Sequence, residues 1–514
     1  MSIQHMHDPR GLKRYWPNAL LFLVIAVALM YVQWITNAHR VLHEMGDFGA
    51  NSLLILDAKR LRLLYGNYSR ISVHHPGPAI LYVLAAGEAL FHDLLHLAPS
   101  PFSGQLLAVC FYSAAWIVLI FAIMRDITGA ALPALLFTTA FTAALGLFEP
   151  TVFLGAWFPD LYILPFATVV VAISRLAFGY ANRLRALAVA SGFVINGHVS
   201  FIPMLGVMLI AMLAANWLIS RRDPEKRILS AAFLKRHRRE ILISIGILFL
   251  FFVPLLILTV TEFPGPVYDY IAFGGHDKHN TLTEALKFVG AYWTPNRAFI
   301  WGGLLALLLL SGLRASNQFL RDARAFGIAF IAASLAVLVY AKFGVDYLDR
   351  LYLGLFYYSV PALAGALLVL YLYQLVPWTS KAGLAALVSV AALCATCWAA
   401  LKPSYYDELY DIHGSAQLYD RLRALPGTGR IVLDVEQKPG DWDYVWGNVI
   451  ALELHARRQG ENLFCVNQNW HLLFTRPARC RPEELNTARR FYVRPMRTAE
   501  MVDAKPDFEG QGLL

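Results

Sequence analysis

Long apolar runs separated by short polar segments dominate the first 400 residues of the chain. Many of these runs approach the roughly 20 residues that an α-helix needs to cross about 30 Å of hydrocarbon. The pattern predicts a polytopic α-helical membrane protein with about 11 transmembrane helices. The expected spans lie at 19–37, 104–124, 130–148, 160–178, 186–197, 200–219, 240–260, 299–314, 323–341, 351–374 and 380–400.

Basic residues predict the orientation of these spans, because loops rich in Lys and Arg stay cytoplasmic. The segment 221–240 carries eight Lys and Arg residues, and Arg125 and Arg183 mark further cytoplasmic turns. All these basic turns fall on the cytoplasmic side only if the apolar stretch 77–97, which Glu88, His92 and Asp93 interrupt, does not cross the membrane. An interfacial or re-entrant helix is expected there. The N-terminus is then cytoplasmic and the C-terminus lies outside.

Composition supports the membrane assignment and narrows the function. Hydrophobic residues make up 58% of the chain and charged residues 15%, which excludes an ordinary soluble globule. The net charge of +9 lies in loops between helices, so it does not indicate nucleic acid. No GxxxxGK[ST] or strand–GxGxxG–helix signature is present, which argues against an ATP-driven pump. The basic N-terminus lacks a small-x-small cleavage site, so a retained first helix is expected.

The composition changes after residue 400. The strand candidate GRIVLDVEQ, 429–437, precedes a helical stretch around WGNVIALELHARRQG. The chain is therefore expected to divide into a transmembrane domain, 1–400, and a small α/β domain outside the membrane, 401–514. Within the first domain, 38–103 is the first external loop, with surface helices, and 261–298 is a lid-like external loop.

Two of the five cysteines, Cys465 and Cys480, lie fifteen residues apart in the C-terminal segment. This spacing is compatible with a disulfide in an oxidising compartment. A zinc site is disfavoured because no second Cys/His pair stands at ligand spacing. The cysteines within predicted spans are expected to pack as small apolar side chains; they are Cys110, Cys394 and Cys397.

An acidic residue follows the first span in an unusual setting. Asp47 lies between two glycines in HEMGDFGAN, and a charge near a bilayer is costly and often functional. Residues 53–64 then show a helical apolar stripe with Lys59, Arg60 and Arg62 on the other side. This stripe predicts a helix on the membrane surface whose cations meet lipid phosphate.

Proline makes the following segment stiff. Arg70 precedes His74 and His75, which Pro76 and Pro78 hold on a bend. The histidines are candidates for substrate binding. The alternative is a loop at the membrane interface whose bends are set by the two prolines.

Polar residues also stand in the second external loop, 148–162, and between two short apolar runs. Glu149 and Asp160 flank an aromatic stretch, and Asp160 is a candidate catalytic acid or an N-cap. Asn196 and His198 stand at membrane depth. Burying such polar groups at this depth costs free energy unless they line a cavity or form hydrogen bonds within the protein. The two residues therefore either line a cavity or have a structural role.

The last external loops combine aromatic and charged residues. His276 lies in a flexible aromatic stretch that suits either a lid over a sugar or lipid headgroup or an aromatic interface belt. Arg350 could bind phosphate bidentately or pair with Asp349, and Tyr352 follows it.

External loops thus bring carboxylates, histidines and arginines to one face. Such a set suits attack on a phosphate-linked carbon, with a carboxylate as general base and cations or a metal stabilising the departing phosphate. No cofactor is certain. A divalent metal is an option, with Asp47, Asp160 and His75 as ligands.

The order of these parts resembles the GT-C superfamily of integral-membrane glycosyltransferases, in particular the bacterial branch with the lipid A aminoarabinose transferases and protein mannosyltransferases. The resemblance covers about residues 15–220. It is carried by the acidic residue after the first span and by the stretches HHPGPAILYVLAAGEALF, QLLAVCFYSAAWIVLIFAIMRDITGAALPALLF, GAWFPDLY and LAVASGFVINGHVSFIPML.

The resemblance implies transfer of a sugar from a polyprenyl-phosphate donor to an envelope lipid or glycan on the periplasmic face of the bacterial inner membrane. Asp47 falls on the family's catalytic carboxylate and Asp160 on its second-loop acidic position. Two family lysines expected to hold donor phosphate are His75 and Asn196 here.

Because those lysines are missing, other groups are needed for the donor phosphate. His75, Arg70 and Arg350 are the candidate substitutes. Two alternatives to a transferase stay open: a transporter or flippase for lipid-linked glycans, and a non-catalytic membrane assembly or sensor protein. A transporter usually shows repeated halves, and no convincing repeat relates 1–220 to 240–400.

Overall fold

The computed structural model describes residues 9–69, 73–274, 279–293, 318–375, 413–426, 429–435, 442–467 and 478–493, with single positions between 381 and 390. Its contacts group the chain into two compact units. We call the first the helical unit; it comprises Met1–Trp34, Val109–Val253 and Ile271–Lys402. The second, the mixed unit, comprises Ile35–Ala108, Pro254–Tyr270 and Pro403–Leu514.

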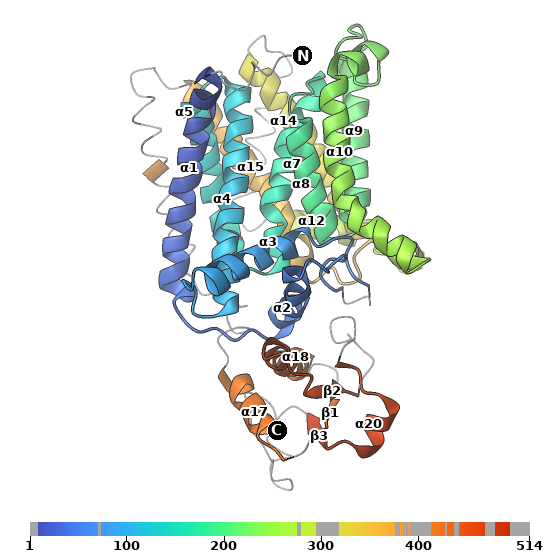
Figure 1. The fold of residues 1–514 in the computed structure, drawn as a ribbon. Coiled ribbons are helices and arrows are strands. Elements are labelled where there is room, and N and C mark those ends of the chain that lie inside the picture. Colours follow the sequence, from blue (N-terminus) through green and yellow to red (C-terminus); the bar gives the residue numbers. More distant parts are fainter. Residues whose placement is uncertain are drawn as a thin grey trace, which may run out of the picture. The chain divides into compact units, whose positions relative to one another are not determined.

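Long helices lie side by side in the helical unit (Figure 1). They are α1 (Pro9–Gln33), α4 (Pro101–Thr128), α5 (Ala131–Phe148), α7 (Ile163–Ser174), α8 (Leu184–Gly197), α9 (Phe201–Ile219), α10 (Ala231–Thr261), α14 (Gln318–Phe343) and α15 (Ser359–Leu375). Residues 101–108 of α4 and 254–261 of α10 belong to the mixed unit. Short segments connect them: η4 (Pro150–Phe153), α6 (Phe158–Leu161), η5 (Arg175–Phe178), α12 (Leu282–Ala291) and η6 (Leu351–Tyr358).

Burial within this bundle follows the hydropathy of the sequence. Every residue of α7 is buried, whereas α1, α9 and α10 expose large apolar side chains such as Leu23, Ile210 and Leu250. A helix that is apolar all round belongs either in a core or in lipid. The exposed apolar side chains on these three helices therefore form a lipid-facing surface.

In the described part of the chain, eight helices are long and apolar enough to cross a membrane. All eight coincide with predicted spans, and the shorter apolar helix Leu184–Gly197 coincides with the span expected at 186–197. The spans predicted at 299–314 and 380–400 fall on residues that the structure does not describe, apart from single positions. The chain is a multi-pass helical membrane protein.

The segment 38–103, predicted as the first external loop, belongs to the mixed unit, and its helices differ from the predicted ones. The helix α2 runs from Gly46 to Lys59, so the surface helix predicted at 53–64 is wrong in its bounds: Leu61 has φ +56, which ends a helix. Eight of the 14 residues of α2 are buried. It therefore packs inside the mixed unit, because its apolar residues are met by protein on several sides.

The stretch expected not to cross the membrane is helical. It forms α3 (Ala79–Gly87) and the π-helical η3 (Glu88–Leu94). Neither is among the helices long enough to span. The helix α11 (Gly265–Gly274) follows α10 in the chain, and its residues up to Tyr270 belong to the mixed unit.

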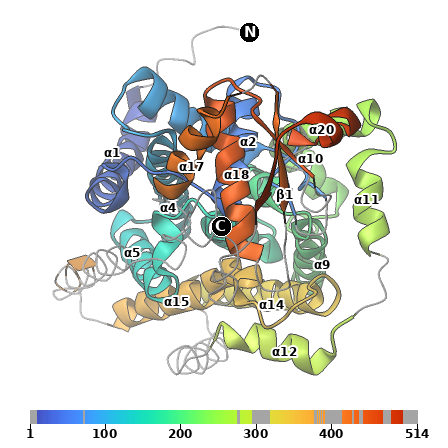
Figure 2. The same cartoon turned by 90° about the horizontal axis from the view of Figure 1, so that it is seen from below.

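The C-terminal part of the mixed unit is a small α/β domain. Its three strands, β1 (Ile431–Val435), β2 (Phe464–Val466) and β3 (Arg490–Val493), form a parallel sheet in the order β2-β1-β3. The helices α17 (His413–Arg423) and α18 (Trp442–Arg458) lie on one side of this sheet and α20 (Pro482–Thr487) on the other (Figures 1 and 2). A disulfide joins Cys465 to Cys480, as the spacing allowed.

Candidate active site

The carboxylate of Asp47 lies in the first turn of α2. Gly46, which opens the helix, has φ +55, a left-handed conformation that favours glycine. The partial positive charge at a helix N-terminus stabilises a nearby carboxylate. Asp47 Oδ1 also accepts a hydrogen bond from the hydroxyl of Tyr68, so the helix and the tyrosine together set the direction of this carboxylate.

A short hairpin brings Tyr68 and the predicted histidines together. Tyr68 pairs with His74 in an antiparallel bridge, and the amide of His75 donates to the carbonyl of Asn67 at 2.9 Å. The ring of His74 lies 4.1 Å from that of Tyr65. Asp47, His74 and His75 therefore share one small region of the mixed unit. Arg70 lies outside the described residues.

Ion pairs at the far end of α2 account for one of the predicted lipid-facing cations. Lys59 Nζ lies 2.8 Å from Glu88 Oε1 and 2.5 Å from Asp93 Oδ2. Burial lowers the pKa of Lys59, but hydrogen bonds to Asp93 and Glu88 outweigh it, so the pKa is raised. The prediction that Lys59 meets lipid phosphate is wrong, because two carboxylates of η3 already neutralise it.

Two carboxylates lie close together in the segment between α5 and α7 of the helical unit. Glu149 Oε1 accepts from Thr151 Oγ1 at 2.7 Å, and both residues lie close to Asp160. Burial raises the pKa of Glu149 in spite of its hydrogen bonds to Thr151. A Cβ on Gly155 would lie 2.8 Å from Asp160 Oδ2, so glycine is needed for this close approach.

Asp160 does not cap a helix, contrary to the alternative that its position allowed. The N-cap of α6 is Trp157, and Asp160 lies within the helix. Asp160 is only 2% exposed, and its Oδ1 has no hydrogen-bond partner among the described residues. Tyr352 of η6 contacts this region: its ring lies 5.3 Å from that of Trp157.

The other polar residues expected at membrane depth pack as structure. Asn196 Nδ2 donates to the carbonyl of Phe251 in α10 at 3.0 Å. The ring of His198 lies 6.4 Å from those of Tyr162 and Tyr340. Tyr162 also donates to the carbonyl of Gly197 at 2.7 Å.

Arg350 and His276 are the two remaining residues predicted to bind substrate. Arg350 is exposed and its guanidinium lies 5.9 Å from the ring centre of Tyr347. His276 lies outside the described residues.

Sequence reasoning missed Tyr68 and Thr151 as partners of the acidic residues. Thr151 stands two positions after Glu149, a spacing at which a hydroxyl can reach a carboxylate. The sequence around Tyr68 does not indicate a contact with Asp47, because this contact depends on the hairpin.

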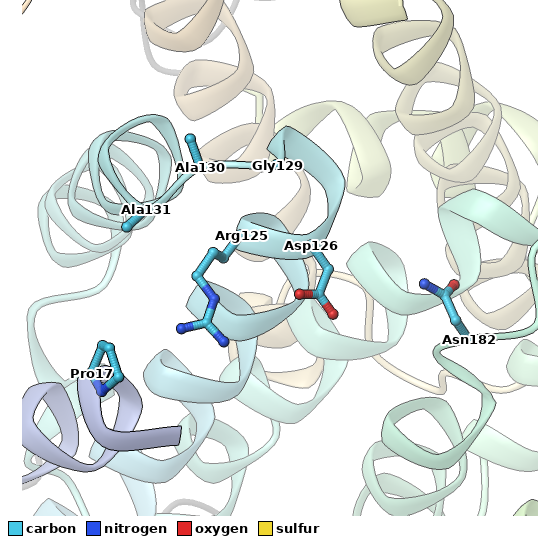
Figure 3. Close-up of a pocket in the computed structure, with 7 residues that line it drawn as sticks. All are labelled: Pro17, Arg125, Asp126, Gly129, Ala130, Ala131 and Asn182. Atoms are coloured by element: carbon cyan, nitrogen blue, oxygen red, sulfur yellow. The ribbon is translucent and has the colours of Figure 1, made fainter. Parts of the chain in front are cut away.

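An open pocket of about 630 Å³ lies at the other end of α5 from Glu149 (Figure 3). It is lined by Pro17, Arg125, Asp126, Gly129, Ala130, Ala131 and Asn182. Asp126 forms an ion pair with Arg183. Since α5 has 18 residues, about 27 Å separate its ends, so this pocket is distinct from the carboxylate pair.

The described residues contain no group of three or more His, Cys, Asp and Glu side chains placed to hold a metal ion. Within the helical unit, the oxygens of Glu149, Asp160 and Thr151 are of the type that hard cations bind. They supply two carboxylates and one hydroxyl.

Comparisons with known proteins identify the fold. No family model matches the chain, and no curated protein matches its sequence. The crystal structure of ArnT from Cupriavidus metallidurans bound to undecaprenyl phosphate matches with a TM-score of 0.54 and 14% identity, covering 90% of this chain and 88% of that chain. The apo structure of the same ArnT matches with a TM-score of 0.55 and 14% identity, covering 91% and 88%.

These matches extend over both units of the chain, including the C-terminal part to which the sequence resemblance did not reach. At 14% identity they establish the fold and not the activity. The chain has the GT-C-like fold of ArnT, the fold that the resemblance of its first 220 residues implied.

Proposed function

We propose that this protein is an integral-membrane glycosyltransferase that moves a sugar from a polyprenyl-phosphate donor to an envelope lipid or glycan. The observation that carries the proposal is the placement of Asp47. In a chain with the fold of ArnT, this carboxylate opens α2 and is oriented by Tyr68. The undecaprenyl phosphate bound to ArnT supports a donor of this chemical class.

In this proposal Asp47 is the general base or a metal-linked carboxylate. A hydroxyl or amine of the acceptor attacks the anomeric carbon of the sugar, and the bond from that carbon to the phosphate oxygen breaks. The phosphate leaves with the bonding electrons, and Asp47 takes the proton from the acceptor. The hydrogen bond from Tyr68 to Oδ1 keeps the carboxylate in one orientation, which favours the proton transfer.

The donor phosphate needs positively charged or hydrogen-bonding partners. His74 and His75 lie on the hairpin that carries Tyr68, and with Arg70 and Arg350 they are our candidates for this role. His75 is 4% exposed, and its backbone is held by hydrogen bonds with Asn67 and Gly66. Within the helical unit, Asp160 beside Glu149 is proposed as a second catalytic acidic group, as the family resemblance implies.

Disulfide and charge support a periplasmic site in the inner membrane. Cys465 and Cys480 are joined, and such bonds persist in oxidising compartments. The basic segment 221–240 belongs on the cytoplasmic side. The C-terminal domain is then periplasmic, as is the first external loop.

Turnover of the purified protein tests the proposal. The protein is reconstituted in vesicles with a panel of radiolabelled polyprenyl-phosphate sugars and an envelope lipid extract. We expect released polyprenyl phosphate together with a labelled acceptor. A flippase would instead move the labelled lipid between leaflets without cleaving it, and that result would contradict a transferase.

A further inference from the structure

We infer that the C-terminal helix α18 positions the carboxylate of Asp47, so that the C-terminal domain is part of the active-site architecture and not an appended module. The inference rests on the proposed function of Asp47. It is carried by three sets of contacts within the mixed unit: glycine contacts, a buried ion pair and a shared apolar core.

Glycines allow α18 and α2 to approach closely. A Cβ added to Gly447 of α18 would lie 2.3 Å from Cε of Met45, the N-cap residue of α2. A Cβ added to Gly49 of α2 would lie 2.9 Å from Cγ2 of Ile450. Met45 stands two residues before Asp47. The contact between the helices is therefore made at the turn that carries the carboxylate.

An ion pair fixes the chain just before α2. Arg458, in the last turn of α18, binds both carboxylate oxygens of Glu44; one of these contacts, from Nη1 to Oε2, is 3.1 Å. The side chain of Glu44 is fully buried and that of Arg458 is 15% exposed. Burial raises the pKa of Glu44, but Arg458 and Ser52 lower it by more, so this carboxylate stays charged. A bidentate pair in a buried place has one strongly preferred geometry.

The apolar core of the C-terminal domain includes part of the first external loop. Ala50 of α2 is a buried member of this core, and Leu53 and Tyr68 pack against it. The residues of α18 in the same core are Val445, Trp446, Val449, Ile450, Leu452 and Ala456. Tyr68, the hydrogen-bond donor to Asp47, is thus held by the same core as the helix that carries Asp47.

These contacts make α18 a positioning element. The backbone next to Asp47 is held by the close approach of Gly447, whose added Cβ would lie 3.5 Å from the amide nitrogen of Gly46, and by the ion pair of Glu44. The carboxylate is oriented by Tyr68, which packs against the core that contains α18. A displacement of about 1 Å at a catalytic group can cost a hundredfold in rate. A shift of α18 toward Met45 should therefore lower turnover while leaving the binding of the donor largely unchanged.

The experiment uses the full-length protein with Gly447→Ala, Met45→Ala and the double variant. The added methyl group of Gly447→Ala would overlap Cε of Met45, a side chain that is 4% exposed and has little room to move away; Met45→Ala in the double variant makes room for it. We expect kcat to fall about tenfold or more in Gly447→Ala, with KM for the donor within about twofold, and to recover in the double variant. Gly429→Ala is the matched control, because nothing lies within 4 Å of a Cβ added at that glycine.

Hydrogen exchange of the peptide spanning α2 gives a readout that does not require activity. Gly447→Ala should speed amide exchange in the first turn of α2, and the double variant should restore it. Exchange that changes in this way while the wild type cleaves no sugar donor would support the positioning and contradict the proposed function. Unchanged exchange in α2, or turnover by Gly447→Ala equal to that of Gly429→Ala in an active protein, would overturn the inference. So would a loss of turnover that the double variant does not repair.

Discussion

At the scale of single residues, the acidic groups differ in their surroundings. Asp47 is half-buried at a helix N-terminus and receives a hydrogen bond from Tyr68. Asp160 is fully buried close to Glu149, which accepts a hydrogen bond from Thr151. A general base must reach the proton that it accepts. Asp47, which is half-buried, is therefore better placed for this role than Asp160.

The hydroxyl of Tyr68 is expected to matter for catalysis and little for folding. Tyr68→Phe removes the hydrogen bond to Asp47 Oδ1 but keeps the ring in the core. We expect kcat to fall about tenfold to a hundredfold, since positioning contributes on that scale. The matched control is Tyr82→Phe, which removes a hydroxyl that donates to the carbonyl of Leu63 at 3.0 Å. Equal turnover of the two variants would show that Tyr68 does not orient Asp47.

Glu453 in α18 predicts a pH dependence of stability. Burial raises its pKa to about 7, despite the lowering effect of Arg457 and Arg430. Because the folded state binds the proton more tightly than the unfolded state, stability is lost as the pH rises from about 4.5 to about 7 and stays lost above. The loss is about 3 kcal/mol.

Glu453→Gln, which mimics the protonated acid, should therefore raise the Tm of the protein at pH 8 and change it little near pH 4.5. The exposed Glu483→Gln serves as the control. Thermal unfolding in detergent across this pH range measures the effect. A Glu453→Gln variant that melts like the wild type at pH 8 would contradict the raised pKa.

Local sequence predicted Asp47 and Asp160 but not their partners. Asp47 could be singled out because it stands between two glycines just after a span. The Tyr68 hydroxyl reaches it across 21 positions, and this distance closes only when the hairpin folds. A contact of this kind has no signature in local spacing.

At the scale of elements, small residues set how closely helices cross. A Cβ added to Gly87, at the end of α3, would lie 2.2 Å from Cβ of Ala108 and 2.8 Å from the carbonyl oxygen of Gly104. Next to this crossing, Glu88 Oε2 accepts from Gln105 Nε2 at 2.8 Å. The glycine therefore permits a buried hydrogen bond between η3 and α4.

Gly87→Leu should destabilise the protein by about 1–3 kcal/mol, as overpacking does, and lower its apparent Tm by several degrees. The same change at Gly206 of α9 is the control, because nothing lies within 4 Å of a Cβ there. Equal melting of the two variants would indicate that the crossing of η3 and α4 tolerates a larger separation.

Hydropathy predicted the long helices well and the shorter elements poorly. A run such as 130–148 needs only its length and apolar character to be recognised, and α5 occupies it from Ala131 to Phe148. By contrast, the stripe at 53–64 led to a wrong surface helix. Leu53 of this stripe packs against the core of the C-terminal domain, and a stripe does not tell whether lipid or protein covers it.

At the scale of the whole molecule, the chain joins distant segments into one unit. Contacts group 35–108 with 403–514, although about 300 residues separate them. The predicted boundary at residue 400 stays a prediction. Sequence pattern could not reveal the association, because neither segment shows its partner in its own periodicity.

The orientation of the chain in the membrane is also testable. If the segment 221–240 is cytoplasmic, a cysteine introduced at Arg222 should resist a membrane-impermeant maleimide in intact cells and react after the membrane is opened. The unmodified chain provides the background reaction of its own cysteines. Labelling of Arg222→Cys in intact cells would reverse the orientation and place the sites proposed above in the cytoplasm.

The central claim is that Asp47 carries sugar transfer from a polyprenyl-phosphate donor. Its most direct test compares the turnover of Asp47→Asn with that of Asp57→Asn, the same change ten residues further along α2. We expect Asp47→Asn to lose at least about a hundredfold in kcat, the usual contribution of a general base, while it is expressed normally and Asp57→Asn stays near the wild type. Wild-type turnover by Asp47→Asn in membranes would contradict the account.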